Sequence, residues 1–157
     1  MKKIYSIALA LLALPLALTS CSNNDNDLPN VAFNMNVSGA VMDDNTIYIV
    51  RGDTLNIESL NVTNLDSDKV AMVTDAQYFW DYNYIGGTPF APYNFNIVVG
   101  DSTALGDHLL TVRAEVIAVD KTPAFAIVDY PVVVVADSTQ MPTNPLAAST
   151  VQTALKQ

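Results

Sequence analysis

The segment from Tyr78 to Tyr84 carries the side chains with the most recognisable chemistry in the chain. It places five aromatic residues within seven positions, and one of them is the only tryptophan, Trp80. Aromatic faces stack on the apolar faces of sugar rings, and the intervening Asp81 and Asn83 offer partners for sugar hydroxyls. If these rings are exposed, the segment predicts a binding surface for a glycan or a protein.

The same residues also fit a buried strand. On one strand Tyr78, Trp80, Tyr82 and Tyr84 would share a face, and that face would be the core of a β-sandwich. This interpretation is favoured for the row because a sandwich without a disulfide needs a large central side chain. The alternative is an exposed aromatic rim around the Gly86-Gly87 turn, formed by Tyr82, Tyr84, Phe90 and Tyr93.

Groups for catalysis or metal binding are sparse. His108 is the only histidine, and it follows a Gly-Asp pair, so a turn contact explains it better than a Ser-His-Asp or Cys-His set. The acidic turns at 43–45 and 66–68 lack the spacing and the glycine of a calcium loop. We therefore predict no enzyme activity, no metal and no cofactor.

The first twenty residues read as a secretory signal peptide. Lys2 and Lys3 precede an apolar run from Ile4 to Leu18, which is short for a membrane-spanning helix. The run leads into Leu18-Thr19-Ser20-Cys21, which resembles the lipobox of bacterial lipoproteins. The resemblance implies cleavage before Cys21 and fatty acyl chains, such as palmitate, on that residue. A single cysteine in an exported chain agrees with this role, since it can form no internal disulfide.

A polar tether, residues 21–30, follows the signal peptide. Its Asp25 and Asp27 resemble a thin version of the surface-export signal of Bacteroidetes-type lipoproteins, and a plain solvated linker is the alternative. The expected location is the outer membrane, on its periplasmic or its cell-surface face, with the surface slightly favoured.

The chain is strongly acidic. Its formal charge is −9, and loss of Lys2 and Lys3 with the signal peptide leaves five Lys and Arg against sixteen Asp and Glu, a charge of −11. Such a chain repels phosphate backbones, so nucleic-acid binding is excluded. Membrane contact is expected through the lipid anchor alone.

Residues 31–136 alternate apolar and polar side chains as strands do. In one segment Leu110, Val112, Ala114, Val116 and Ala118 share a parity. A slip of parity between Ile57 and Leu60 predicts a bulge or a strand that changes sheets, and Pro131 predicts a sheet edge or a bulge. Together the pattern predicts an all-β fold, an immunoglobulin-like antiparallel β-sandwich of about seven strands.

Two stretches resemble immunoglobulin-like and PKD-like modules of bacterial surface proteins. One is Tyr78–Tyr93, which is similar to the C strand and the turn after it. The other is formed by Gly106, His108, Leu110, Val112 and Ala114. The resemblance implies a fold and no activity.

Several short motifs remain. The Arg51-Gly52-Asp53 triplet is better read as turn chemistry than as an adhesion motif. Three Asp-Ser/Thr triplets resemble the O-glycosylation sequon of Bacteroidetes exported proteins, with Thr54, Ser102 and Ser138 as acceptors. Residues 137–157 are expected to form a linker followed either by a short terminal helix capped at Asn144 or by a frayed tail.

Two classes of function follow. The first is a non-catalytic surface binding or adhesion module, which requires exposed aromatic side chains near Gly86. The second is a structural or assembly component of an envelope complex. It requires a buried aromatic row and a free sheet edge, for which the apolar segment Phe125–Val135 is the candidate.

Overall fold

The computed structural model describes residues 28–66, 69–145, 151–153 and 155–156 of the chain. The signal peptide, Cys21 and residues 22–27 of the tether lie outside this part. Among the residues described, no helix is long and apolar enough to cross a membrane.

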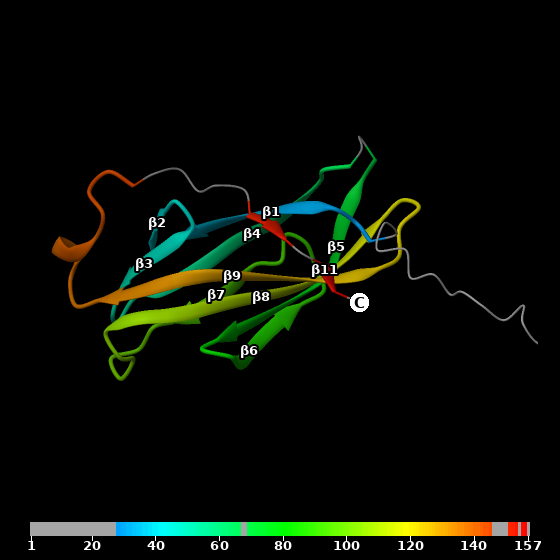
Figure 1. The fold of residues 1–157 in the computed structure, drawn as a ribbon. Helices are drawn as coiled ribbons and strands as arrows, with labels where there is room; N and C mark the ends of the chain where they lie inside the picture. The colour runs from blue at the N-terminus through cyan, green and yellow to red at the C-terminus, as the bar shows by residue number, and fades with distance from the viewer. Residues whose placement is uncertain (1–27, 67–68, 146–150, 154, 157) are drawn as a thin grey trace, which may run out of the picture.

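The strands form two sheets that pack as an immunoglobulin-like β-sandwich (Figure 1). The first sheet has the order β10 (Val151–Thr153), β1 (Val31–Ser38), β4 (Thr54–Asn64) and β7 (Phe95–Val98). The second has the order β2 (Val41–Asp43), β3 (Thr46–Val50), β9 (Ala124–Val135), β8 (Gly106–Ala118), β5 (Ala71–Trp80) and β6 (Asn83–Thr88), and β11 (Leu155–Lys156) also pairs with β9. Strands β7 and β6 are thus the edges at one open side.

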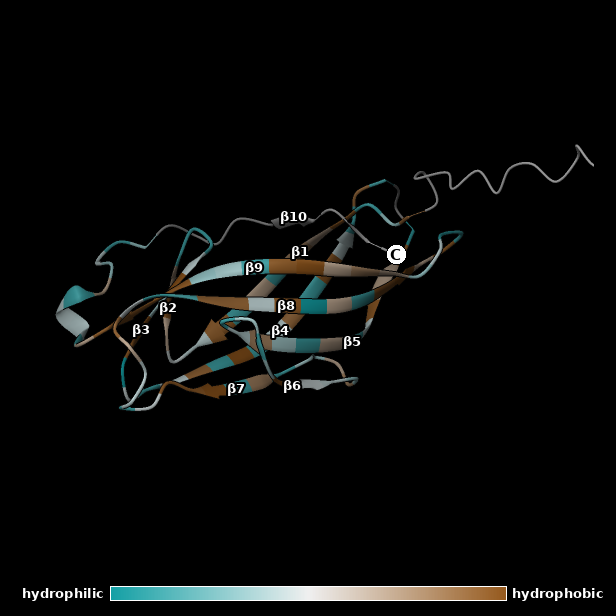
Figure 2. Cartoon of the chain, turned by 60° about the horizontal axis from the view of Figure 1, so that its bottom comes forward, coloured by the Kyte–Doolittle hydropathy of each residue, from teal (hydrophilic) through white to brown (hydrophobic). Residues whose placement is uncertain are grey.

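The alternation of apolar side chains builds the core between the sheets. The predicted inward residues of β8 from Leu110 to Val116 are fully buried, and Ala118 is half-buried at the strand end. They face the buried Phe33 and Leu55 of the other sheet. Figure 2 shows the resulting alternation of hydrophobic and hydrophilic bands along β8. Each buried Val, Leu or Phe side chain contributes about 1.5–3 kcal/mol, so hydrophobic packing is the main force that holds the sheets together.

The slip of parity in β4 is a bulge, as predicted. The pairing with β1 runs Asn36 to Ser59 and then Val37 to Ile57, so Glu58 is an extra residue in β4. The extra residue lets both Ile57 and Leu60 point into the core.

The segment Phe125–Val135 is not the free edge that the assembly hypothesis requires. Strand β9 pairs with β8 from Ala124 to Val134. On its other side β3 pairs in parallel with residues 132–135, and β11 pairs with residues 125–126. Pro131 pairs with Leu109 of β8 without a shift of register, so it marks no bulge. On its other side the described strands pair only with residues 125–126 and 132–135, which leaves Pro131 at a locally open part of β9.

The predicted terminal helix is wrong for the described part of the tail. Residues 138–140 form a 3-10 turn, Val151–Thr153 pair with β1, and Leu155–Lys156 pair with β9. Unpaired backbone at the sheet edges outweighs a modest helix propensity in so short a segment. These two strands and the three-residue β2 are too short to be recognised in the sequence from an alternation of apolar and polar residues. They account for most of the excess of eleven strands over the predicted seven.

Candidate functional site

The aromatic segment is a hairpin and not one continuous strand. Strand β5 ends at Trp80, and Asp81 and Tyr82 have positive φ angles of 46° and 67°, which make a tight two-residue turn into β6. Phe79 then pairs with Tyr84 across the hairpin. The expectation that Tyr82 and Tyr84 continue the face of Tyr78 and Trp80 is therefore wrong.

The aromatic residues divide between the core and the surface. Tyr78 is fully buried and stacks on Phe95 with ring centroids 4.9 Å apart. Trp80 is half-buried and packs against the core. Tyr82 and Tyr84, in contrast, are 83% and 62% exposed. Tyr78 and Trp80 thus belong to the core side, and Tyr82 and Tyr84 at the hairpin tip are surface residues.

The two remaining aromatic candidates separate in the same way. Tyr93 is half-buried, packs against the core and donates its hydroxyl to the carbonyl oxygen of Val73, so it is not part of a rim. Phe90 is 75% exposed but lies in the loop after β6.

The exposed tyrosines lie on the outer face of the second sheet. The ring of Tyr84 meets Phe79 edge-on at a centroid distance of 5.5 Å. A hollow of about 170 Å³ is lined by Phe79, Tyr82, Thr111, Arg113 and Ile127. We call these five residues and Tyr84 the outer shelf. Arg113, Thr111 and Ile127 come from β8 and β9, and only the strand register, which the sequence does not reveal, places them beside the hairpin.

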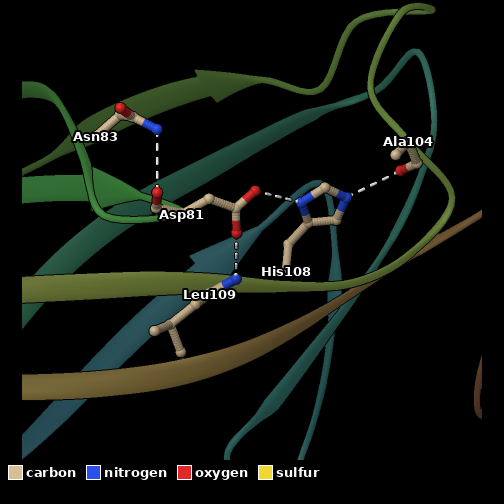
Figure 3. Close-up of polar contacts among 5 residues, drawn as sticks. All are labelled: Asp81, Asn83, Ala104, His108 and Leu109. Carbon is tan, nitrogen blue, oxygen red and sulfur yellow. Dashed lines mark hydrogen bonds and ion pairs between the residues drawn. The ribbon is translucent and has the colours of Figure 1, made fainter.

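Asp81 and His108 fix the hairpin turn to β8 (Figure 3). His108 Nδ1 lies 2.7 Å from Asp81 Oδ2, and Nε2 lies 2.9 Å from the carbonyl oxygen of Ala104. The backbone N–H of Leu109 donates to Asp81 Oδ1 at 2.9 Å, and the Asn83 amide donates to the Asp81 carbonyl oxygen at 3.0 Å. Asp81 and Asn83 are therefore engaged in holding the turn, and His108 makes the turn contact expected of it.

These contacts shift the pKa values of both side chains. Burial alone lowers the pKa of His108, but the hydrogen bonds to Asp81 and Ala104 and the charges of Asp81 and Asp107 outweigh it, so its pKa is raised. Burial opposes ionisation of Asp81 too, yet the bonds from His108 and Leu109 leave its pKa lowered. The imidazolium form has an acceptor at each ring nitrogen, which accounts for the direction.

This pair predicts a stability maximum at mildly acidic pH. A raised pKa of His108 stabilises the fold below its unfolded value of about 6.5 and is lost as pH rises through the folded value. The lowered pKa of Asp81 stabilises the fold above about 3.9 and is lost as pH falls. We expect the urea midpoint to fall as pH rises from about 6.5 through the raised folded pKa of His108, and His108→Ala to abolish that slope. Equal slopes in both proteins would contradict the assignment.

An edge groove of about 350 Å³ lies between β6 and β7 at the open side of the sandwich. Strands β6 and β7 border this side in Figure 2. The residues that line it include Trp80, Asn83, Ile85, Phe95, Asn96 and Thr103. Of the predicted ligand-binding residues, only Asn83 lines this groove. Asn96 and Thr103 carry no sequence signal beyond their neighbouring strand and turn.

The other motifs take ordinary structural places. The Asp53 N–H donates to the Val50 carbonyl oxygen at 3.1 Å, which makes the Arg-Gly-Asp triplet a turn, as expected. Thr54 is half-buried at the start of β4, whereas Ser102 and Ser138 are exposed. Within the described part of the chain, no three His, Cys, Asp or Glu side chains are placed to hold a metal ion.

Comparisons with known proteins identify no family. No family model matches the chain, and no curated protein matches it. Among solved structures, the fibronectin(III)-like modules of Clostridium thermocellum CbhA are similar at 18% identity and a TM-score of 0.38, over 60% of this chain and 92% of that chain. The fold assignment rests on the strand order of this chain itself.

Proposed function

We propose that the protein is an exported, lipid-anchored binding module without catalytic activity, and that its ligand is a glycan. Residues 1–20 direct export, Cys21 carries the lipid, and the tether holds the sandwich off the outer membrane, on its cell-surface face. The exposure of Tyr82 and Tyr84 beside Phe79 on the outer shelf carries the proposal.

Exposed rings of this size have a physical cost that a ligand would relieve. Aromatic side chains left in water lose about 25 cal/mol for each Å² of apolar surface that burial would have removed. A sugar ring presents an apolar face to such rings and hydroxyls to neighbouring polar groups. Thr111, bound to Asp129 at 2.6 Å, and Gln77, bound to Asp75 at 3.1 Å, supply such groups nearby on the second sheet.

The structural or assembly role is the second candidate function. The strand edge through which it would act is not the one that the sequence predicts. The edge predicted from the sequence, strand β9, pairs with other strands on both sides over much of its length. In the described part of the chain, the first sheet ends at β10 and at the four-residue β7, and the second ends at β2 and β6, so the outer edges belong to these four strands. A protein that bound no glycan would leave this role as the better account.

The proposal predicts that the Tyr82→Ala/Tyr84→Ala double variant binds glycan about tenfold more weakly than the wild type, since each ring contact contributes about 0.5–1.5 kcal/mol. The measurement is affinity electrophoresis of the full chain in detergent through gels that contain mannan, xylan or dextran. Phe90→Ala is the matched control, because Phe90 is equally exposed but outside the outer shelf. Wild-type mobility that no polysaccharide changes would refute the proposal.

A further inference from the structure

We infer that the edge groove between β6 and β7 is a second binding site, and that it takes one end of a neutral saccharide. The inference rests on the proposed function in that the ligand is again a glycan. The inference adds a second site. It also predicts that the ligand is uncharged, which the outer shelf does not predict.

The groove has apolar walls of the right kind for a sugar ring. Trp80 and Phe95 contribute aromatic surfaces, and Ile85 contributes an aliphatic one. At one end β6 comes so close that a Cβ on Gly86 would lie 2.6 Å from the Phe95 ring, so the groove closes there. A volume of 350 Å³ is at the small end of the range for ligand sites, about 300–1,000 Å³, and suits about one or two sugar rings.

The polar groups of the groove select for an uncharged, hydroxylated ligand. Asn83 offers its amide oxygen and the N–H that its bond to Asp81 leaves over, and Thr103 offers a hydroxyl that both donates and accepts. None of the described residues that line the groove is ionisable. An anion would therefore meet no countercharge there and would approach a chain with a large excess of acidic residues.

A peptide strand fits this side of the sandwich less well than a saccharide. Strand β7 has only four residues, and the pairing of β6 with β5 shifts register between Tyr78 and Phe79, opposite Gly86. Short and irregular edges are poor templates for an added strand. Side-chain recognition of a compact ligand needs no continuous backbone ladder.

Trp80 makes the inference directly testable because it is the only tryptophan and it lines the groove. The full chain in detergent is titrated with oligosaccharides from mannan, xylan and dextran, and with oligogalacturonate as the acidic probe. We expect at least one neutral oligosaccharide to shift the Trp80 emission and to reduce its quenching by iodide, and oligogalacturonate to do neither.

Variants separate the groove from the outer shelf. Thr103→Val removes one hydrogen-bonding group and is expected to weaken binding of the neutral ligand about 5-fold, the value for a net hydrogen bond of about 1 kcal/mol. Thr122→Val is the control, since Thr122 is exposed in the β8–β9 turn, at the far end of β8 from the hairpin.

The outcomes distinguish this inference from the proposed function. Binding of a neutral saccharide that needs Tyr82 and Tyr84, but neither changes the Trp80 emission nor weakens in Thr103→Val, overturns the inference and leaves the proposed function intact. Binding of oligogalacturonate more strongly than of any neutral oligosaccharide overturns the inference that the ligand is uncharged. Binding of no saccharide in any assay overturns both proposals.

Discussion

Replacing Tyr78 by alanine is expected to lower the free energy of unfolding by about 3–5 kcal/mol, the usual cost of removing a buried aromatic side chain. The ring is completely buried, stacks on Phe95 and donates its hydroxyl to the Tyr93 carbonyl oxygen. It therefore links β5 to β7 and to the loop before β7. Domains of this size are stable by about 5–15 kcal/mol, so this variant would be close to unfolding.

Tyr78→Phe is the matched control for the ring. Burial, with a smaller effect of Tyr130, raises the pKa of Tyr78, so its hydroxyl stays protonated and donates throughout the ordinary pH range. Its loss leaves the Tyr93 carbonyl oxygen without this donor and should cost about 1 kcal/mol. Urea unfolding followed by circular dichroism measures both variants. If alanine costs no more than phenylalanine, Tyr78 is not a core residue.

Replacing Cys21 by alanine is expected to abolish lipid attachment completely. One acyl chain binds a membrane only marginally, at about 0.8 kcal/mol per buried methylene, whereas two or three chains hold a protein there durably. The wild-type chain in its native host should take up a clickable palmitate analogue and partition into the detergent phase. The variant should show no label.

A control variant and a second measurement make the Cys21 result decisive. Ser22→Ala is the control, because it changes the neighbouring residue and keeps the thiol. Mass spectrometry of the labelled wild-type protein should find Cys21 as the modified N-terminal residue. Label that persists in Cys21→Ala, or a mature N-terminus elsewhere, would contradict the anchor and leave the sandwich without its proposed attachment.

The sequence predicts the fold best where a local pattern determines the structure. Alternation places Leu110 and Val112 of β8 in the core because side chains on a strand point to opposite faces in turn. The slip of parity marks the bulge at Glu58 for the same reason. The turn at Gly52 follows from its φ of 99°, which glycine adopts without strain.

The sequence predicts less where long-range pairing decides. Nothing in the apolar run of β9 shows that β3 joins it in parallel at Val132. The tail strands depend on unpaired edges that exist only after the sheets have formed. Short segments take whichever pairing the folded sheets offer, and local propensity does not record it.

In the candidate site, too, local sequence predicts some residue positions and long-range pairing decides the others. The favoured prediction from the aromatic segment, one buried row, is correct for Tyr78 and wrong for the exposed Tyr82 and Tyr84. It does not reveal that two residues with positive φ turn the chain after Trp80, since neither Asp81 nor Tyr82 is glycine. Strand register places Arg113 on the outer shelf. Tyr93 does not lie on the predicted rim, because its hydroxyl donates a hydrogen bond to the carbonyl oxygen of Val73.

Hydrogen exchange of the full chain in detergent, measured by mass spectrometry with and without a neutral oligosaccharide from mannan, xylan or dextran, tests the central claim most directly. A binding module that uses the hairpin and the edge groove predicts slower exchange in peptides that cover residues 78–88 and 94–104. Exchange at β2 and β3, far from both sites in the strand order, should not change. Exchange that no saccharide alters, or protection confined to β2 and β3, would contradict the account.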